Sequence, residues 1–283
     1  MSAEPHASTH STQKCVGVWR GSERVAGLDP ADRGLAYGDG VFETLLAHAG
    51  SLPWWPRHRA RWMHGAQRLG IAFPQASLLE QALSDALQWQ PDGVIKLVLT
   101  RGAGGRGYAP SAALPTLVVS VSERPAAAPP ALSIDVLRCN LAEQPVLAGI
   151  KHLNRLEQVL GSIEAKERGL DDGLMATSNG HITCSTRANV FACIEGQWRT
   201  PPLDRAGVAG TARGVLMDQW PELTVAPLTH GNLQRVEALF LANAVRGILP
   251  VGRLGARDVD AEHTGIGLAR ALLADSHSGF RET

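Results

Sequence analysis

The hydrophobic pattern in the first half of the chain switches between strand and helix periods. Apolar residues that alternate with polar ones predict strands, and apolar residues repeated every three or four positions predict amphipathic helices. We therefore expect strands at 16–20, 23–26, 41–47, 93–100 and 116–122, and helices at 58–71 and 77–88. The third strand follows Gly38, Asp39 and Gly40, which suit a tight turn.

The second half of the chain contains mainly strands joined by short turns. Asn179 with Gly180, and Glu195 with Gly196, lie between apolar runs, and such pairs are typical of hairpins. The predicted strands are 132–139, 172–177, 181–184, 189–194, 197–200, 238–243 and 248–251. The predicted helices are 154–169, one that begins after Gly210, and 267–274. Helices mixed with hairpin-connected strands favour an α+β fold over a doubly wound parallel sheet.

A proline- and alanine-rich stretch at 124–131 (RPAAAPPA) is the clearest boundary in the sequence. Its composition is that of a stiff, extended connection between domains. We therefore predict a small N-terminal domain at 15–123, a linker at 124–131 and a larger C-terminal domain at 132–283. Residues 1–14 are rich in Ser, Thr and His without an apolar run, which predicts a disordered tail and not a secretory signal.

Composition excludes several classes of partner. The 283 residues carry a formal net charge of zero, and no run of Lys and Arg suits a nucleic-acid backbone. No apolar stretch is long enough to span a membrane. The four cysteines show neither a CxxC pair nor a Cys/His metal spacing, so we expect no metal and reduced thiols in a cytoplasmic protein.

Lys151 is the main candidate for chemistry. It precedes a predicted helix in the segment 149–158 (GIKHLNRLEQ). Burial lowers the pKa of a lysine, and a neutral amine can form a Schiff base with a carbonyl cofactor. Taken by itself, Lys151 could equally be a solvated lysine at a helix entry.

Two other segments could bind a phosphate group. Thr211 and Ala212 begin a helix after Gly210, and free backbone N–H groups at a helix start attract anions. Ordinary helix capping explains the same residues. Arg61 lies on an amphipathic helix, where its guanidinium is either an ordinary surface group or a fork for phosphate.

The glycine-rich segment 101–108 (RGAGGRGY) contains Arg101, Arg106 and Tyr108. A cationic, exposed loop of this kind could hold a carboxylate substrate, and a plain hairpin loop is an equally good interpretation. It is not a dinucleotide fingerprint, because no helix follows it within a βαβ unit.

The order of seven motifs resembles the fold-type IV pyridoxal-phosphate enzymes, which include branched-chain and D-amino-acid aminotransferases. The motifs are DRGLAYGDGVFETL (32–45), HRAR (58–61), RGAGGRGY (101–108), KHLNRLEQVL (151–160), ANVF (188–191), PPLDRAGVAGTAR (201–213) and NAVRGILPV (243–251). The lysine segment and the glycine-rich segment are most similar to those of the 4-amino-4-deoxychorismate lyases.

This resemblance implies a small N-terminal α/β domain and a larger, barrel-like C-terminal β domain with flanking helices. It also implies pyridoxal 5'-phosphate as cofactor, an active site between the domains, and a homodimer whose subunits share the site. Lys151 resembles the lysine that carries the cofactor, and Arg155 takes the place of a tyrosine near the cofactor's ring oxygen. The motif positions that resemble phosphate-binding residues are Arg61, Thr211, Ala212, Asn243 and Ala244. Those that resemble substrate-binding residues are Arg33, Tyr37, Arg106 and Tyr108.

One position departs from the family pattern. Cys184 stands where the family has a glutamate that pairs with the pyridine nitrogen of the cofactor. This departure weakens the expected electron withdrawal by the ring. The other interpretation is that Cys184 is a small buried residue and that a different acid takes this role.

The resemblance implies a lyase that converts 4-amino-4-deoxychorismate to 4-aminobenzoate and pyruvate in folate synthesis. Aromatisation of the product helps to drive that reaction, so a weaker electron sink suffices. The alternatives are an aminotransferase acting on branched-chain or D-amino acids, and a pyridoxal-phosphate-binding protein without catalysis.

Overall fold

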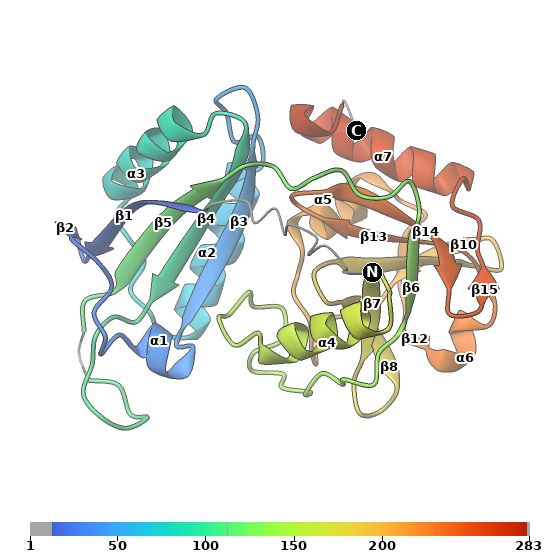
Figure 1. The fold of residues 1–283 in the computed structure, drawn as a ribbon, viewed down its shortest axis with the longest axis horizontal. Helices are drawn as coiled ribbons and strands as arrows, with labels where there is room; N and C mark the ends of the chain where they lie inside the picture. Colours follow the sequence, from blue (N-terminus) through green and yellow to red (C-terminus); the bar gives the residue numbers. More distant parts are fainter. Residues whose placement is uncertain (1–12, 112, 282–283) are drawn as a thin grey trace, which may run out of the picture.

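The computed structural model describes residues 13–111 and 113–281, and these form two sheets that lie side by side (Figure 1). The first sheet has five antiparallel strands in the order β2-β1-β5-β4-β3. Its strands are β1 (Lys14–Arg20), β2 (Glu23–Val25), β3 (Gly40–Ala47), β4 (Gly93–Thr100) and β5 (Thr116–Ser122). The long register of β3 on β4, from Gly40 opposite Thr100 to Ala47 opposite Gly93, makes β3 a straight edge facing the second sheet.

Two amphipathic helices, α2 (Trp55–Arg68) and α3 (Ala76–Trp89), cover one face of this sheet. Trp62 and Ala66 of α2, and Leu79 and Leu83 of α3, are buried in one apolar core with the strands. Burial of such side chains stabilises the fold by ~1.5–3 kcal/mol each. A short helix, α1 (Arg33–Tyr37), precedes β3, and the side chain of Asp32 caps it through the N–H of Gly34.

The second sheet closes on itself. Its strand order is β11-β10-β9-β13-β14-β6-β7-β8-β12, and β8 also pairs with β9, which completes a barrel-like ring. The strands that form the ring are β6 (Leu132–Val136), β7 (Asp172–Ala176), β8 (His181–Ser185), β9 (Asn189–Ile194), β13 (Val236–Asn243) and β14 (Gly247–Leu254). The shorter strands are β10 (Gln197–Thr200), β11 (Thr224–Val225), β12 (Leu228–Thr229) and β15 (Arg257–Asp258). Strand β6 runs parallel to both β14 and β7, whereas the other pairs within the ring are antiparallel.

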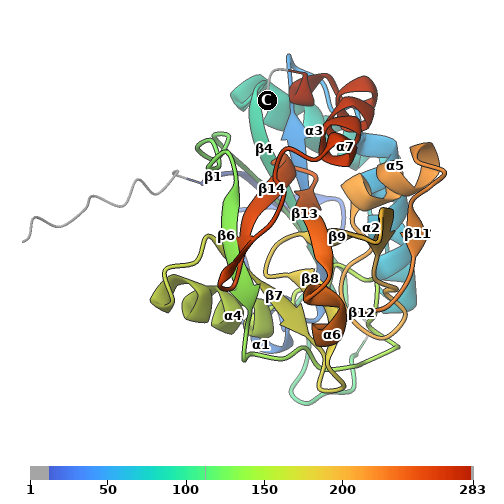
Figure 2. The ribbon, with the colours of Figure 1, turned by 90° about the vertical axis from the view of Figure 1, so that its right-hand side faces the viewer.

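Helices flank the ring (Figure 2). Helices α5 (Thr211–Gln219) and α7 (Thr264–Ser276) pack together and share an apolar core with the stacked rings of Phe191 and Phe240. Helix α4 (Leu156–Glu167) lies against β7, and Gly161 fits there because a Cβ would crowd Leu137 and Met175 at 3.2 Å. The remaining elements are α6 (His230–Leu233) and the 3-10 turn η1 (Ser278–Phe280).

The α+β fold expected from the sequence is confirmed, with a small sheet domain and a larger barrel-like one. The proline-rich stretch 124–131 lies between β5 and β6, the strands that end one sheet and begin the other. The sequence patterns did not predict α1, α6, β11, β12 or β15, because elements of two to five residues hold too few positions to show a period. The short strand β10 lies at 197–200 as predicted, since the turn at Glu195 and Gly196 indicated a hairpin there. The expected strand at 132–139 ends at Val136.

The predicted tail covers residues 1–14, and residues 1–12 lie outside the described residues. Lys14 belongs to β1, where it pairs with Val121, so the first strand begins inside the predicted tail. In the described part of the chain, no helix is both long and apolar enough to cross a membrane.

Candidate active site

A cavity of 410 Å³ lies between the two sheets. Its walls come from β3 and α2 on one side and from the lysine segment, the ends of β8, β9 and β13, and the start of α5 on the other. The lining residues include Phe42, Arg61, Lys151, Arg155, Cys184, Arg187, Asn189, Gly210, Thr211, Asn243, Ala244 and Arg246. Lysine, arginine and glycine from segments far apart in the sequence thus meet at one place.

Backbone hydrogen bonds on both sides hold the lysine segment across the cavity. The N–H of Phe42 donates to the carbonyl of Lys151 at 2.9 Å, and that of Leu153 donates to Gly40 at 2.9 Å, so the segment pairs with β3. On the other side, Gly149 donates to Gly207 at 3.0 Å and accepts from Ala209 at 3.1 Å. Lys151 is therefore fixed between the two domains.

The amine of Lys151 has an environment suited to a neutral nucleophile. Burial, and next the positive charge of Arg61, lower the pKa of this amine from 10.5 to about 7. Among the described residues, no carboxylate forms an ion pair with it, and its Nζ lies over the ring of Phe42, 4.3 Å from the ring centroid. A large fraction of this lysine is consequently neutral near pH 7, as Schiff-base chemistry requires.

Arg61 is anchored by a buried carboxylate. Its Nε donates to Glu43 at 2.8 Å, its Nη2 donates to the same carboxylate, and its Nη1 donates to the carbonyl of Ala209 at 2.9 Å. Glu43 also contacts Nδ1 of His58 at 2.6 Å. These contacts use three of the five guanidinium N–H groups, and two remain for an anion in the cavity.

Charge compensation explains why Glu43 can be buried. Burial alone would raise the pKa of this carboxyl, but the positive charge of Arg61 and the hydrogen bonds with Arg61 and His58 outweigh that effect and lower it to about 2. Burial lowers the pKa of His58 itself, so Arg61 provides the main compensating charge. Glu43 stays ionised, so it holds the guanidinium in one orientation.

The start of α5 lies at the cavity with its first N–H groups free of a side-chain cap. Gly210 is the N-cap and has no side chain to cap the first N–H groups of the helix. A Cβ on Gly210 would lie 1.9 Å from Oδ1 of Asn189, whose amide donates to the carbonyl of Val208 at 3.0 Å. The side chain of Thr211 lines the cavity, and Ala212 is buried in the core behind it.

Asn243 orders the turn after β13. Its Oδ1 accepts from the N–H groups of Val245 at 3.0 Å and Arg246 at 2.8 Å, and its Nδ2 donates to the carbonyl of Arg187 at 3.4 Å. The side-chain amide of Asn243 is therefore occupied by partners within the protein. Ala244, in the turn that these contacts order, lines the cavity.

Arg155 and Cys184 also line the cavity. The guanidinium of Arg155 donates to the carbonyls of His152 at 2.9 Å and Ile150 at 3.0 Å, and burial lowers its pKa to about 10. Burial raises the pKa of the Cys184 thiol to about 12, even though Arg155 opposes this effect, so the thiol stays neutral.

No aspartate or glutamate is among the described residues that line the cavity. Asp172 lies behind Cys184, but its carboxylate accepts hydrogen bonds from Ser185 at 2.9 Å and from Thr186 Oγ1 at 2.6 Å. It also forms an ion pair with Arg187 at 3.3 Å. No described acidic residue on the cavity wall therefore replaces the glutamate that the family has at the position of Cys184.

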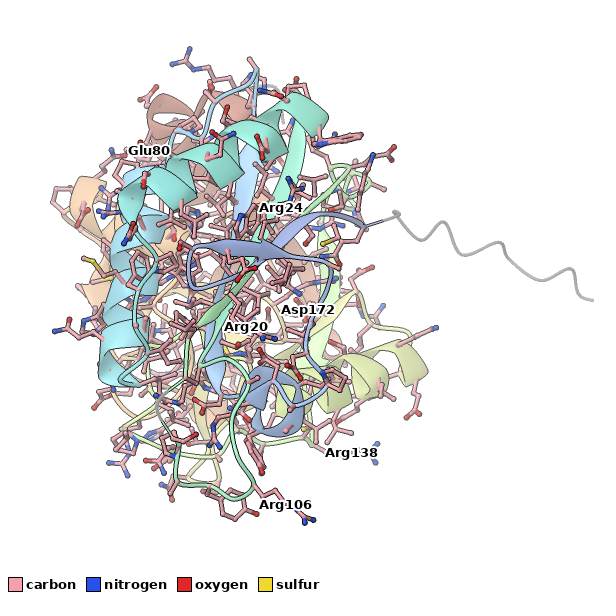
Figure 3. The ribbon with its side chains drawn as sticks, turned by 90° about the vertical axis from the view of Figure 1, so that its left-hand side faces the viewer. Arg20, Arg24, Glu80, Arg106, Arg138 and Asp172 are labelled. Carbon is pink, nitrogen blue, oxygen red and sulfur yellow. The ribbon has the colours of Figure 1, made fainter. Side chains whose placement is uncertain are left out.

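The four expected substrate residues lie together, away from this cavity wall. Arg33 is buried, and it donates to Asp39 at 2.9 Å and to the carbonyls of Gly107 at 2.9 Å and Tyr108 at 2.8 Å, so it orders the glycine-rich loop. The rings of Tyr37 and Tyr108 lie 5.6 Å apart, and Tyr108 is 86% exposed. Arg106 lies at the tip of the loop, with its side chain pointing into solvent (Figure 3).

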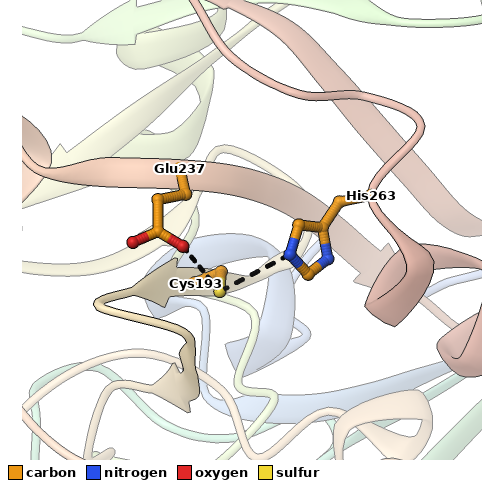
Figure 4. A group of neighbouring side chains, drawn as sticks. All are labelled: Cys193, Glu237 and His263. Atoms are coloured by element: carbon orange, nitrogen blue, oxygen red, sulfur yellow. Dashed lines mark hydrogen bonds between the residues drawn. The ribbon is translucent and has the colours of Figure 1, made fainter.

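A separate cluster joins Cys193 of β9, Glu237 of β13 and His263, the N-cap of α7 (Figure 4). The sulfur lies 3.6 Å from the carboxylate and 3.9 Å from Nε2 of the imidazole. However, Nδ1 of His263 accepts the N–H of Gly265 at 3.1 Å, which places the proton of the neutral ring on Nε2. This tautomer offers the cluster no lone pair for a metal ion, and the contacts serve to cap α7 and bury a thiol.

Comparisons with known proteins identify the class. The Amino-transferase class IV family matches residues 40–254, and the chain belongs to this family. The chain is 32% identical over 235 residues to an aminodeoxychorismate lyase of Vibrio harveyi, covering 80% of this chain and 86% of that protein. The crystal structure of 4-amino-4-deoxychorismate lyase from Pseudomonas aeruginosa has a TM-score of 0.83 and 36% identity, covering 91% of this chain and 98% of that one. A D-alanine aminotransferase of Bacillus licheniformis is 25% identical, with 90% and 91% covered.

Enzymes of this family use pyridoxal 5'-phosphate, and the cavity fits this cofactor. The fit rests on the neutral lysine, the free N–H groups of Arg61 and the uncapped start of α5, where only glycine fits beside Asn189. Near Cys184, none of the described lining residues is an acid that would charge a pyridine nitrogen.

Several contributors were not anticipated from the sequence: Phe42, Glu43, His58, Arg187 and Arg246. Glu43 interrupts the apolar run 41–47, and a charge in such a run indicates a buried partner. His58 and Arg61 are three positions apart on a helix, a spacing that places both on one face. These two signals together would have predicted the ion pair.

Proposed function

We propose that this protein is an aminodeoxychorismate lyase, which converts 4-amino-4-deoxychorismate to 4-aminobenzoate and pyruvate, a step of folate synthesis. The observation that carries the proposal is the buried, neutral Lys151 beside a phosphate-binding helix start, in a chain 32–36% identical to two lyases over most of its length. Arg155 in the motif KHLNRLEQ supports the lyase within this family, because the resemblance assigned a tyrosine there to the aminotransferases.

The cofactor, when bound, draws electrons away from the ring carbon that carries the substrate amine. Arg61 and the N–H groups of Thr211 and Ala212 would hold its phosphate. Lys151, released as a neutral amine, accepts the proton from that ring carbon. The C–O bond to the enolpyruvyl group then breaks, the ring becomes aromatic, and Lys151 returns a proton to carbon to give pyruvate. A pKa near 7 lets this one group act as base and then as acid.

The neutral thiol of Cys184, with no carboxylate among the described residues that line the cavity, favours a lyase over an aminotransferase. A thiol with a pKa of about 12 cannot supply the negative charge that keeps a pyridine nitrogen protonated. Transamination depends on that protonated ring to stabilise a carbanion, whereas formation of an aromatic product provides its own driving force.

We further propose a cytoplasmic homodimer. Helix α4 presents an exposed apolar stripe at helical spacing, formed by Leu156, Val159, Leu160 and Ile163. The stripe follows the lysine segment directly, so a second copy packed on it would lie close to the cavity. In that assembly the exposed Arg106 and Tyr108 could close the cavity of the partner subunit, which would reconcile their assigned substrate role with their distance from the cavity of their own chain.

The experiment is a product assay on the purified holoenzyme. With 4-amino-4-deoxychorismate and no keto-acid, we expect fluorescent 4-aminobenzoate and an equal amount of pyruvate. Borohydride should fix the cofactor on Lys151, and Lys151→Ala should abolish both product release and fixation. If branched-chain or D-amino acids convert the bound cofactor to its amine form much faster than 4-aminobenzoate appears, the aminotransferase alternative is correct.

A further inference from the structure

Arg187 and Arg246 lie on two neighbouring turns at the edge of the cavity. Arg187 belongs to the turn between β8 and β9, and Arg246 to the turn between β13 and β14. Strands β9 and β13 are paired, with Asn189 opposite Ala242, so both turns emerge at the same end of the barrel. The bond from Nδ2 of Asn243 to the carbonyl of Arg187 joins the two turns, and both arginines line the cavity.

The protein does not use all the N–H donors of either guanidinium in the described part of the chain. In the described part of the chain, Arg246 forms no ion pair, and its side chain donates only to the carbonyl of Ala126 at 2.7 Å. Arg187 donates to the carbonyl of Asp171 at 2.5 Å and reaches Asp172 only at 3.3 Å. Each guanidinium has five N–H groups, so most donors of Arg246 and some of Arg187 remain available.

The two positive charges also act on each other. Burial, and next the charge of Arg187, lower the pKa of Arg246. Two like charges close to each other at the edge of the cavity repel, and an anion bound between them would relieve that repulsion. Asp172 offers little to Arg246, because Ser185, Thr186 and Arg187 already occupy its oxygens.

We propose that Arg187 and Arg246 form a carboxylate-binding subsite that holds an anionic substituent of the substrate at the edge of the cavity. A planar carboxylate matches the fork geometry of a guanidinium, and two forks from adjacent turns can bind it from both sides. The assignment of this carboxylate to the substrate rests on the function proposed above. The affinity of the subsite for an anion is independent of that function.

The subsite is distinct in position from the groups that fit the cofactor phosphate. Arg61 and Gly210 come from α2 and the start of α5, and the carbonyl of Ala209 ties them together. Arg187 and Arg246 come from two other turns, and the linker carbonyl of Ala126 fixes Arg246. The two arginine sets can therefore act on different anions at the same time.

The test measures binding to the holoenzyme by calorimetry with isophthalate, a rigid aromatic dicarboxylate, and with benzamide as a neutral probe of similar size. We expect Arg246→Ala to weaken isophthalate binding by at least about tenfold, since charge-assisted hydrogen bonds are lost, and to leave benzamide binding unchanged. Arg246→Lys should restore part of the affinity. Arg253→Ala, an exposed arginine of β14 outside the cavity, is the matched control and should bind as the unmodified protein does.

A second variant, Arg187→Gln, keeps a hydrogen-bond donor beside Asp172 and should also weaken isophthalate binding. In the lyase assay, both variants should raise KM while kcat changes much less. Equal isophthalate affinity in Arg246→Ala and Arg253→Ala would overturn the proposal. A loss of affinity for pyridoxal 5'-phosphate in place of isophthalate would also overturn it, because the arginines would then serve the cofactor. Absence of 4-aminobenzoate from the unmodified enzyme would contradict the proposed function, and the calorimetry would still decide whether the subsite exists.

Discussion

Replacing Lys151 with methionine should stabilise the cofactor-free protein at neutral pH, and the gain should shrink as the pH rises. Methionine keeps the length and the apolar stem of lysine but has no charge to bury. In the folded chain, burial and Arg61 disfavour the charged amine, whereas in the unfolded chain the amine is solvated. The substitution removes a group that opposes folding in the absence of cofactor.

The magnitude follows from the pKa of the amine, which is 10.5 when unperturbed and about 7 in the folded protein. At 1.36 kcal/mol per pKa unit, the folded state is destabilised by ~5 kcal/mol at low pH. Between pH 7 and 10.5, the unfolded chain binds a proton that the folded chain does not bind, so the stability of the unmodified protein rises with pH. The penalty should fall from ~5 kcal/mol at pH 6.5 to ~1.5 kcal/mol at pH 9.5.

The assay is urea unfolding of the cofactor-free protein at these two pH values, for the unmodified chain and for Lys151→Met. Lys166→Met, at an exposed position of α4, is the control for a lysine lost from the surface. The difference in the free energy of unfolding should narrow by ~3 kcal/mol between pH 6.5 and pH 9.5 for Lys151 and stay nearly constant for Lys166.

A stability difference for Lys151→Met that does not depend on pH would refute this reasoning. It would mean that the amine stays charged in the folded protein across this range, with its charge solvated or paired. Any constant gain would then reflect apolar packing of methionine alone, and the chemistry assigned to a neutral Lys151 would lose its basis.

Three further predictions concern the neighbours of the lysine. Glu43→Gln should lower the free energy of unfolding by ~3–5 kcal/mol, because Arg61 loses its buried partner; an unchanged urea midpoint would contradict the ion pair. Gly210→Ala should weaken pyridoxal 5'-phosphate binding by about tenfold or more, because the added Cβ would collide with Asn189 and displace the start of α5. An unchanged Kd in an absorbance titration would show that the phosphate does not bind at this helix start. Cys184→Glu should increase transamination of simple amino acids and keep lyase activity within about tenfold, or ~1.4 kcal/mol in barrier; unchanged transamination would show that charge at this position does not limit it.

The sequence by itself determined the fold class and most of the elements. The apolar periods and the glycine-containing turns are local signals, because each depends on residues only a few positions apart. They predicted the two barrel hairpins whose turns contain Asn179 and Glu195, and the strand β3 that precedes α2. They also predicted that a helix with free N–H groups begins after Gly210. The order of the motifs indicated the family and the cofactor, and it indicated Lys151 as the residue that carries the cofactor.

Only the tertiary structure decided how those residues act. The sequence could not indicate whether Lys151 is solvated, because its pKa depends on β3, α2 and the loop before α5, which are remote in the chain. It likewise could not separate Arg33, whose donors Asp39 and loop carbonyls occupy, from Arg246, which retains free donors at the cavity. Burial and partner geometry set the protonation and availability of a charged group, and both arise from long-range packing that no local period encodes.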